Sequence, residues 1–256
     1  MIFTIAGKEL KALFASPLAW IALTVMQIII GYSFLRRLDD FLQLQPQFVQ
    51  MANPPGATEM VAAPAFATAA AVFLFAVPLL AMRLIAEERR NQTLVLLVSA
   101  PISMTEIVLG KFLGLTAFLL TIVALVALMP LSLAFATQLD YGLLAGYVAG
   151  LALLAASFAA VSLFVSCLTA HPIVAAIGAF AALLGMLLVG DVAGDGLKAR
   201  GWEVAASLAQ VLAPVRNFEP FARGILDTYA VACLLLLALV FLALAVRQLD
   251  ARRLRG

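Results

Sequence analysis

Long apolar stretches separated by short polar ones make up most of this chain. The uncharged stretches are residues 12–35, 60–82, 112–139, 141–190 and 228–246. A helix needs about 20 predominantly apolar residues to cross a bilayer. The stretch 141–190 is long enough for two such helices, with a break at Thr169-Ala170-His171-Pro172. The pattern therefore predicts an all-α polytopic membrane protein with six transmembrane helices.

The polar interruption between the second and third of these helices is not a simple loop. Residues 87–92 read Glu-Glu-Arg-Arg-Asn-Gln and cannot lie in hydrocarbon, and the apolar stretch 93–98 is too short to span a membrane. Pro101 disfavours continuation of a helix. Ser103 and Glu106 have the spacing of a capping box, which starts a new helix. We therefore expect a short apolar-faced helix outside the bilayer, covered either by lipid headgroups or by a partner.

The N-terminal segment 1–16 has the pattern of a helix that lies in the membrane interface. Its apolar positions at helical spacing are Phe3, Ala6, Leu10, Leu13 and Phe14, and its charged positions are Lys8, Glu9 and Lys11. Such an amphipathic helix lies at the bilayer surface instead of spanning it. Ser16-Pro17 then predicts the start of the first membrane helix, with proline at the first helical position.

Two polar stretches are expected at the opposite membrane surface. The first membrane helix should end at the charged cluster after residue 35, where Arg36 and Asp40 can pair on one helix face. Residues 41–58 contain several prolines and are interpreted as an external loop, with or without a short surface helix. The stretch 191–227 is interpreted as an extracytoplasmic loop with an interfacial helix over 202–212, since tryptophan at position 202 suits that depth.

Composition and charge agree with a membrane protein. The chain of 256 residues is 65% hydrophobic and 12% charged, whereas soluble domains are about 45–50% apolar and about 25% charged. Its net charge of +2 gives no indication of nucleic-acid binding. Lysine and arginine are more frequent around the termini and residues 83–111 than on the other side, which places both termini in the cytoplasm.

Catalytic chemistry is poorly supported by the sequence. Gly110-Lys111 lacks the upstream glycine of a Walker A motif, and Phe112 stands where that motif needs Ser or Thr. His171 is the only histidine and lies beside a proline in a predicted turn, so an intramembrane Cys/His or Ser/His hydrolase remains a minor alternative. No cluster of metal ligands is present in the sequence. We expect no cofactor, metal or catalytic residue in this chain.

Glycines at helical spacing indicate close helix packing. Gly142, Gly146 and Gly150 follow the small-xxx-small pattern, and Gly110 with Gly114 repeats it once. The glycines serve either packing within one subunit or a dimer interface, and the sequence leaves both readings open.

The segment 88–101 resembles the cytoplasmic segment of ABC-2 type permeases, roughly E-x-x-x-G-T-[LI]-E-x-L-L-x-x-P. Gln92 stands where glycine is common in that family, and Val95 stands where a second glutamate is common. Residues 8–20 and 214–227 are similar to the permeases associated with gliding motility. The resemblance thus extends over the whole chain.

The resemblance implies one ABC-2 transmembrane domain over residues 1–256, acting as permease subunit of an ATP-driven exporter in the bacterial inner membrane. Its coupling helix over 87–101 would dock an ATPase subunit, which binds ATP and Mg²⁺. The implied docking residues are Glu87, Glu88, Arg89, Arg90, Thr93, Leu94, Leu97, Val98 and Pro101. Further implied partners are a second permease copy or homologue, membrane lipid and an extracytoplasmic accessory protein. A non-transporting membrane anchor of a secretion or motility assembly is the alternative.

Overall fold

The computed structural model describes residues 1–48, 56–92, 103–135, 137–190, 200 and 202–253. This part of the chain is helical, without strands. Its elements are α1 (Ile2–Ala15), α2 (Pro17–Phe48), η1 (Thr58–Ala62), α3 (Ala63–Ala81), η2 (Arg83–Glu87), α4 (Glu88–Arg90), α6 (Met104–Leu131), η3 (Ser132–Phe135), α7 (Tyr141–Leu168), α8 (Pro172–Leu188), α10 (Glu203–Val211), α11 (Pro214–Ala222) and α12 (Thr228–Arg253).

Five stretches of helix in the described residues are long and apolar enough to cross a membrane. They are Pro17–Pro46, Thr58–Arg90, Met104–Phe135, Tyr141–Leu168 and Thr228–Ala251. The predicted hairpin with its break after Leu168 is confirmed, because α7 and α8 flank a short non-helical turn there. However, α8 has 17 residues, fewer than the about 20 that a straight spanning helix needs. The sixth membrane span therefore stays a prediction.

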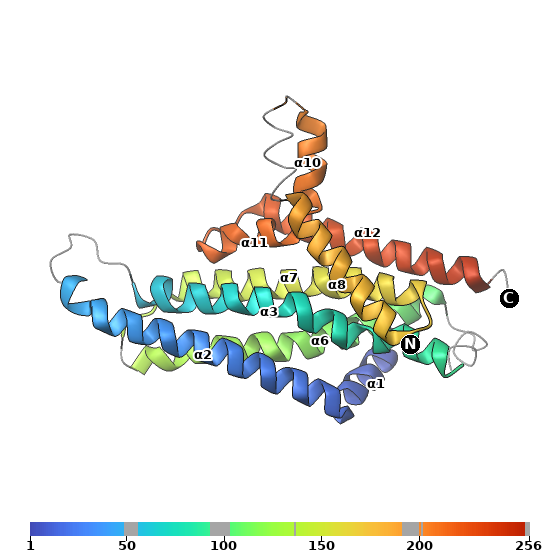
Figure 1. Cartoon of the computed structure of the whole chain (residues 1–256), viewed down its shortest axis with the longest axis horizontal. Coiled ribbons are helices and arrows are strands. Elements are labelled where there is room, and N and C mark those ends of the chain that lie inside the picture. Colours follow the sequence, from blue (N-terminus) through green and yellow to red (C-terminus); the bar gives the residue numbers. More distant parts are fainter. Residues whose placement is uncertain (49–55, 93–102, 136, 191–199, 201, 254–256) are drawn as a thin grey trace.

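The long helices lie roughly side by side along the long axis of the molecule (Figure 1). At one end the chain turns sharply at Ser16, between α1 and α2, and α1 lies across that end of the bundle. The same end holds η2, α4, the α7–α8 turn and the last part of α12 (Figure 1). We call it the terminal end, because both chain termini lie there.

Helix α2 is longer than the sequence pattern predicts. It continues past the charged cluster to Phe48 and contains Pro46, so the expected loop from residue 41 was wrong. The residues between the charged cluster and Pro46 include no glycine or proline, and charged side chains do not end a helix that has left the membrane. The ion pair also differs from the expected one, since Asp40 pairs with Arg37 at 3.8 Å instead of with Arg36.

The second membrane helix also continues beyond its predicted end. Two wider π-helical turns, η1 and η2, adjoin α3 at its two ends, and the helix continues through α4 to Arg90. We call the segment Met82–Gln92 the stem, because it leads from the bundle to residue 93. Residues 93–102, which hold most of the predicted coupling helix, lie outside the described residues. The next helix begins with the predicted capping box of Ser103 and Glu106.

Helix α1 packs on α6 through a face that only partly matches the predicted one. Leu13 is buried and Leu10 and Phe14 are half-buried, as the predicted face requires, but Ile5 and Glu9 are buried too and Phe3 is 85% exposed. The contact is close because α6 presents glycines: a Cβ at Gly110 would lie 2.7 Å from the Cβ of Ile5. The spacing in the α1 sequence predicts an amphipathic helix, but the glycines of α6 decide which face is buried.

The stretch before the last helix is not a surface loop throughout. Helix α10 was expected and projects from the bundle (Figure 1), whereas α11 packs along α7, with Phe221 buried against Gly150. At about 1.5 Å per residue, Gly150 lies about 13 Å from the start of α7. Gly224, with φ of +75°, ends this excursion beside Leu143. The predicted loop 191–227 therefore contains α10 and α11, and its extracytoplasmic position stays a prediction.

Candidate functional site

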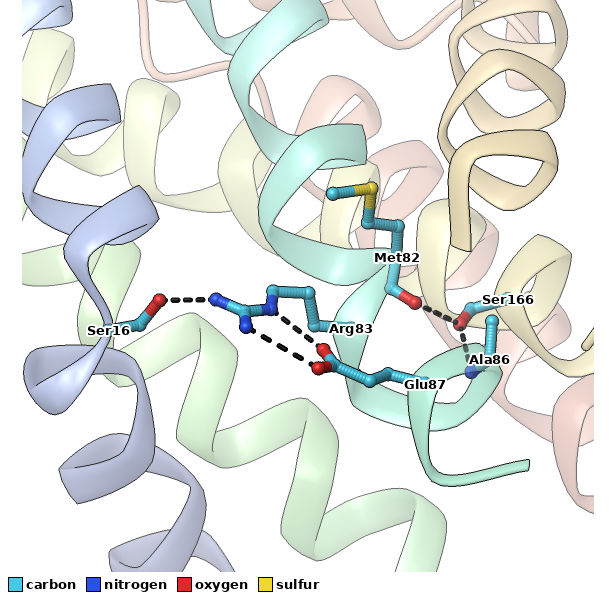
Figure 2. Close-up of polar contacts among 6 residues, drawn as sticks. All are labelled: Ser16, Met82, Arg83, Ala86, Glu87 and Ser166. Atoms are coloured by element: carbon cyan, nitrogen blue, oxygen red, sulfur yellow. Dashed lines mark hydrogen bonds and ion pairs between the residues drawn. The ribbon is translucent and has the colours of Figure 1, made fainter. Parts of the chain in front are cut away.

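The stem contains a turn in which a side chain from another helix replaces a backbone hydrogen bond. In an α-helix, the Ala86 amide would donate to the Met82 carbonyl. Here the hydroxyl of Ser166 on α7 lies between them: it accepts from Ala86 N at 3.1 Å and donates to Met82 O at 3.4 Å (Figure 2). A side chain inserted into the helical ladder interrupts the regular α-helix at that turn. Ser166 thus takes the place of a direct bond between Ala86 and Met82 within η2.

Arg83 ties the stem to the corner between α1 and α2. Its Nε donates to Glu87 Oε2 at 2.7 Å, and its Nη1 donates to the Ser16 hydroxyl (Figure 2). Ser16 is the single residue between the two helices. The position of the α1–α2 corner is thereby linked to the orientation of the stem.

A buried ion-pair triad connects the stem to α1 and α6. Lys111 of α6 is fully buried, and its Nζ lies 2.9 Å from Glu9 Oε1 of α1 and 2.8 Å from Glu88 Oε1 of the stem. A buried ammonium group is stable only when its donors are matched by acceptors. The triad therefore joins three elements that are distant in sequence.

A hydrogen bond from Arg89 also attaches the stem to the end of α7, next to the α7–α8 turn. Arg89 Nη1 donates to the carbonyl oxygen of Cys167 at 3.0 Å, close to the end of α7. Together with Ser166, this bond attaches two successive turns of the stem to α7. The stem is thus attached to α1 and α6 on one side and to α7 on the other.

The stem ends in a backbone conformation that favours glycine. Gln92 has φ of +58°, a left-handed conformation that costs an L-residue about 1–2 kcal/mol. Its amide donates to Arg89 O at 3.2 Å, which completes the helix end. Glycine is the usual residue after a helix terminus of this kind. The family pattern has glycine at this position, and the backbone conformation gives the physical reason.

The predicted docking residues fall into two groups in the structure. Three of the four charged residues, Glu87, Glu88 and Arg89, make contacts inside the chain, whereas Arg90 is exposed. Thr93, Leu94, Leu97, Val98 and Pro101 lie outside the described residues. The role of all these residues in docking an ATPase subunit stays a prediction.

The predicted glycine stripe of α7 lies partly against α11. A Cβ at Gly150 would lie 2.4 Å from the Cβ of Phe221, whereas one at Gly146 would meet only the Cα of Gly224, at 3.9 Å. A Cβ at Gly142 would lie 3.2 Å from Asp140 Oδ1. Gly150 thus serves packing within the chain, and a dimer contact at this stripe stays a prediction.

Sequence reasoning missed Glu9, Lys111 and Ser166. Lys111 gave a usable signal, because a lysine followed by a long apolar stretch requires a partner where a helix meets the membrane. Glu9 gave no usable signal in the sequence, since an acidic residue on an amphipathic helix is typically solvated. Ser166 gave none either, because its role depends on the position of a helix that is distant in sequence.

Five apolar helices of spanning length among the described residues indicate a membrane protein. The chain belongs to the ABC-2 family transporter proteins, since the sequence model of that family matches residues 3–254. Among curated proteins, none matches the sequence. The chain is therefore a transmembrane component of an ABC transporter. This component is not itself catalytic, and its family implies an ABC ATPase partner in general.

Proposed function

We propose that this chain is the permease subunit of an ATP-driven exporter and docks a separate ATPase subunit through residues 87–101. Two copies, or one copy and a homologue, enclose the pathway in the bacterial inner membrane, with both termini in the cytoplasm. The gliding-motility-associated permeases are the branch that it resembles. ATP and Mg²⁺ are bound by the partner, and this chain transmits the motion.

The attachment of the stem is the observation that supports this role. A docking segment transmits force only if its base is fixed to the helices that must move. The stem has such a base, because Ser166, Arg83 and Lys111 attach it to three neighbouring elements. Closure of an ATPase pair would then turn α1, α6 and α7 together as rigid elements.

The docking contact is expected to be mainly apolar. Leu94, Leu97 and Val98 fill a groove of the ATPase subunit, each contributing at most about 1.5–3 kcal/mol on burial. Because its three charged neighbours have partners inside the chain, Arg90 supplies the polar contact at the rim. An acidic residue on the ATPase subunit is the complementary group.

Co-purification tests the docking role. Aspartate at Leu94 and Leu97 places two charges in the groove, so the ATPase subunit should be lost from the detergent-purified complex. The matched control is Leu42→Asp, a 53% exposed leucine at the other end of the molecule, which should retain the ATPase subunit. If the Leu94→Asp/Leu97→Asp variant co-purifies with the ATPase subunit as well as the native chain does, the proposed docking role is contradicted.

Chemical labelling tests the orientation. Both native cysteines are buried, so a Gln92→Cys variant gives a selective signal with a membrane-impermeant thiol reagent. Labelling is expected in inverted vesicles and not in intact cells. Labelling from outside intact cells would contradict the orientation and the docking role together.

Reconstitution separates an exporter from a non-transporting anchor. An exporter with its ATPase subunit in liposomes should hydrolyse ATP faster when its substrate is present. An anchor binds the ATPase subunit without such stimulation. His171→Ala should have little effect on transport, whereas the intramembrane hydrolase alternative predicts that this substitution abolishes the protein's function.

A further inference from the structure

Two cavities lie along the helix formed by α3 and the stem, and we call the line that they follow the seam. The first lies at the terminal end, between the stem and α1 with the α1–α2 corner, and has a volume of about 480 Å³. The second lies between α2 and α3 and has a volume of about 440 Å³. The first is lined by Glu9, Ala12, Leu13, Ala15, Ser16, Pro17, Arg83, Leu84 and Glu87. The first cavity has charged side chains in its lining and the second is apolar. The two cavities thus match the headgroup and an acyl chain of one lipid molecule.

The first cavity combines both signs of charge at the membrane surface. Arg83 supplies a guanidinium group and Ser16 a hydroxyl, while Glu87 and Glu9 supply carboxylates. The side chains of Arg83 and Glu87 are 36% and 34% exposed, so each remains accessible while they pair with each other. Figure 2 shows Arg83 extending between Ser16 and Glu87.

The second cavity is an apolar groove between α2 and α3. Val25 and Ile29 line one wall, and Phe75 and Leu79 line the other. Its only polar side chain is Thr68, whose hydroxyl already donates to Pro64 O and is bonded to the Ser33 hydroxyl, both at 2.9 Å. The groove therefore offers no free polar group and suits a hydrocarbon chain.

The dimensions of the seam match one leaflet. At about 1.5 Å per residue, Leu79 lies about 6 Å from Arg83, and Thr68 lies about 16 Å beyond Leu79. Half of the hydrocarbon core of a bilayer is about 15 Å thick. The apolar groove thus runs over the depth of one leaflet, and the charged cavity lies where the headgroup of that leaflet begins.

We propose that this seam binds a phospholipid with an amine-bearing headgroup, taken from the leaflet at the terminal end. Arg83 and Ser16 bind its phosphate, Glu87 binds its ammonium group, and one acyl chain occupies the groove. The Glu9 carboxylate is already paired with Lys111, so Glu87 is the carboxylate that faces the ligand. It attracts an ammonium group and repels a headgroup that carries only negative charge. When the lipid binds, Arg83 and Glu87 give up their contact with each other. Arg83 then binds the phosphate and Glu87 binds the ammonium group of the zwitterionic headgroup.

Glu87 also belongs to the proposed docking segment 87–101, so lipid binding is measured on the permease chain alone, where the ATPase subunit cannot affect the result. Native mass spectrometry of the purified, delipidated chain measures the binding of added phosphatidylethanolamine, with phosphatidylglycerol for comparison. We expect tighter binding of phosphatidylethanolamine. Glu87→Gln removes the acceptor for the ammonium group and should weaken that binding about tenfold, equivalent to about 1.4 kcal/mol.

A second variant tests the groove without altering charge. Ala71 lines the groove and is exposed, so Ala71→Phe fills the space for the acyl chain without disturbing the core. The matched control is Ala243→Phe at an exposed position of α12. Loss of the bound lipid in Ala71→Phe and its retention in Ala243→Phe are expected.

Three results would overturn the proposal. Equal binding of both lipids by the native chain would mean unselective annular lipid. Equal loss of lipid from Ala71→Phe and Ala243→Phe would exclude the seam as the site. Efficient cross-linking of an Ala71→Cys variant to a second copy in membranes would show that another permease chain covers the groove.

Discussion

At the scale of single residues, the terminal end depends on the ammonium group of Lys111. It is fully buried, and carboxylates from two other elements lie within 3 Å of it. Ion pairs of this kind contribute little compared with an apolar replacement, because desolvation offsets the attraction. Loss of the cation alone is costly, however, because the carboxylates then stay in place without the ammonium group that offsets their charge.

Replacement of Lys111 by methionine should therefore destabilise the protein strongly. Glu9 and Glu88 would lose their shared cation, and breaking a buried pair in this way costs about 3–5 kcal/mol. Chemical unfolding of the purified chain in detergent measures the change. Lys8→Met removes an exposed lysine from α1 and should change the free energy of unfolding by no more than about 0.5 kcal/mol. Equal effects of the two variants would contradict the role of the triad.

Gln92 offers the opposite test, because a substitution there should stabilise the chain. Its φ of +58° is favourable only for glycine, so Gln92→Gly should raise the free energy of unfolding by about 1 kcal/mol. The neighbouring Asn91 has φ of −86°, and Asn91→Gly should give no gain. The measurement is again unfolding in detergent, and a loss of stability in Gln92→Gly would show that the left-handed turn is not formed.

At the scale of elements, the π turn η2 sets the direction in which the stem leaves the bundle. One additional residue in a turn rotates all later residues by about 100°, the angle per residue of an α-helix. The rotation decides that Glu88 points to Lys111 and Arg89 to α7. The element is therefore defined by Ser166, which belongs to another helix.

Ser166→Ala should close this turn. Without the hydroxyl, Ala86 N and Met82 O can pair directly as in an α-helix, so the stem rotates and loses its contacts to Lys111 and α7. Distances between spin labels at Gln92 and Ala12 should change, and stability should fall by about 1 kcal/mol. Ser162 is the control, because its buried hydroxyl on α7 has no hydrogen-bond partner among the described residues. An unchanged label distance in Ser166→Ala would exclude this cause of the π turn.

Local signals explain which elements could be predicted. The capping box of Ser103 and the proline at position 17 act within one turn of helix, so their residues suffice to locate the two helix starts. The end of α2 and the buried face of α1 could not be predicted in the same way. The first depends on where the membrane surface lies along the helix, and the second depends on glycines of α6.

At the scale of the whole molecule, α7 is the central helix for most of the other long helices, although α1 packs on α6 and α2 on α3. It contacts α3, α6 and α12 as well as α8 and α11, and small residues along it allow close approach. Helix α11 uses this property to pack beside α7 within the depth of the bundle. The contact depends on Gly150, which lies far from Phe221 in the sequence.

Two glycines of α7 should therefore differ in their tolerance of alanine. Gly150→Ala places a Cβ 2.4 Å from the Cβ of Phe221, and overpacking of this kind costs about 1–3 kcal/mol. Gly146→Ala has room and should be nearly neutral. Unfolding measurements compare the two variants, and a larger loss for Gly146→Ala would instead favour a dimer contact at that position.

The sequence by itself determined the class of protein, because lipid solubility and helix length are properties of one stretch at a time. It also located the stem, since a charged stretch cannot remain in hydrocarbon. Only the tertiary structure decided how the stem is attached, which face of α1 is buried and where α11 packs. These features arise from contacts between residues far apart in the chain, and no periodicity within one stretch encodes them.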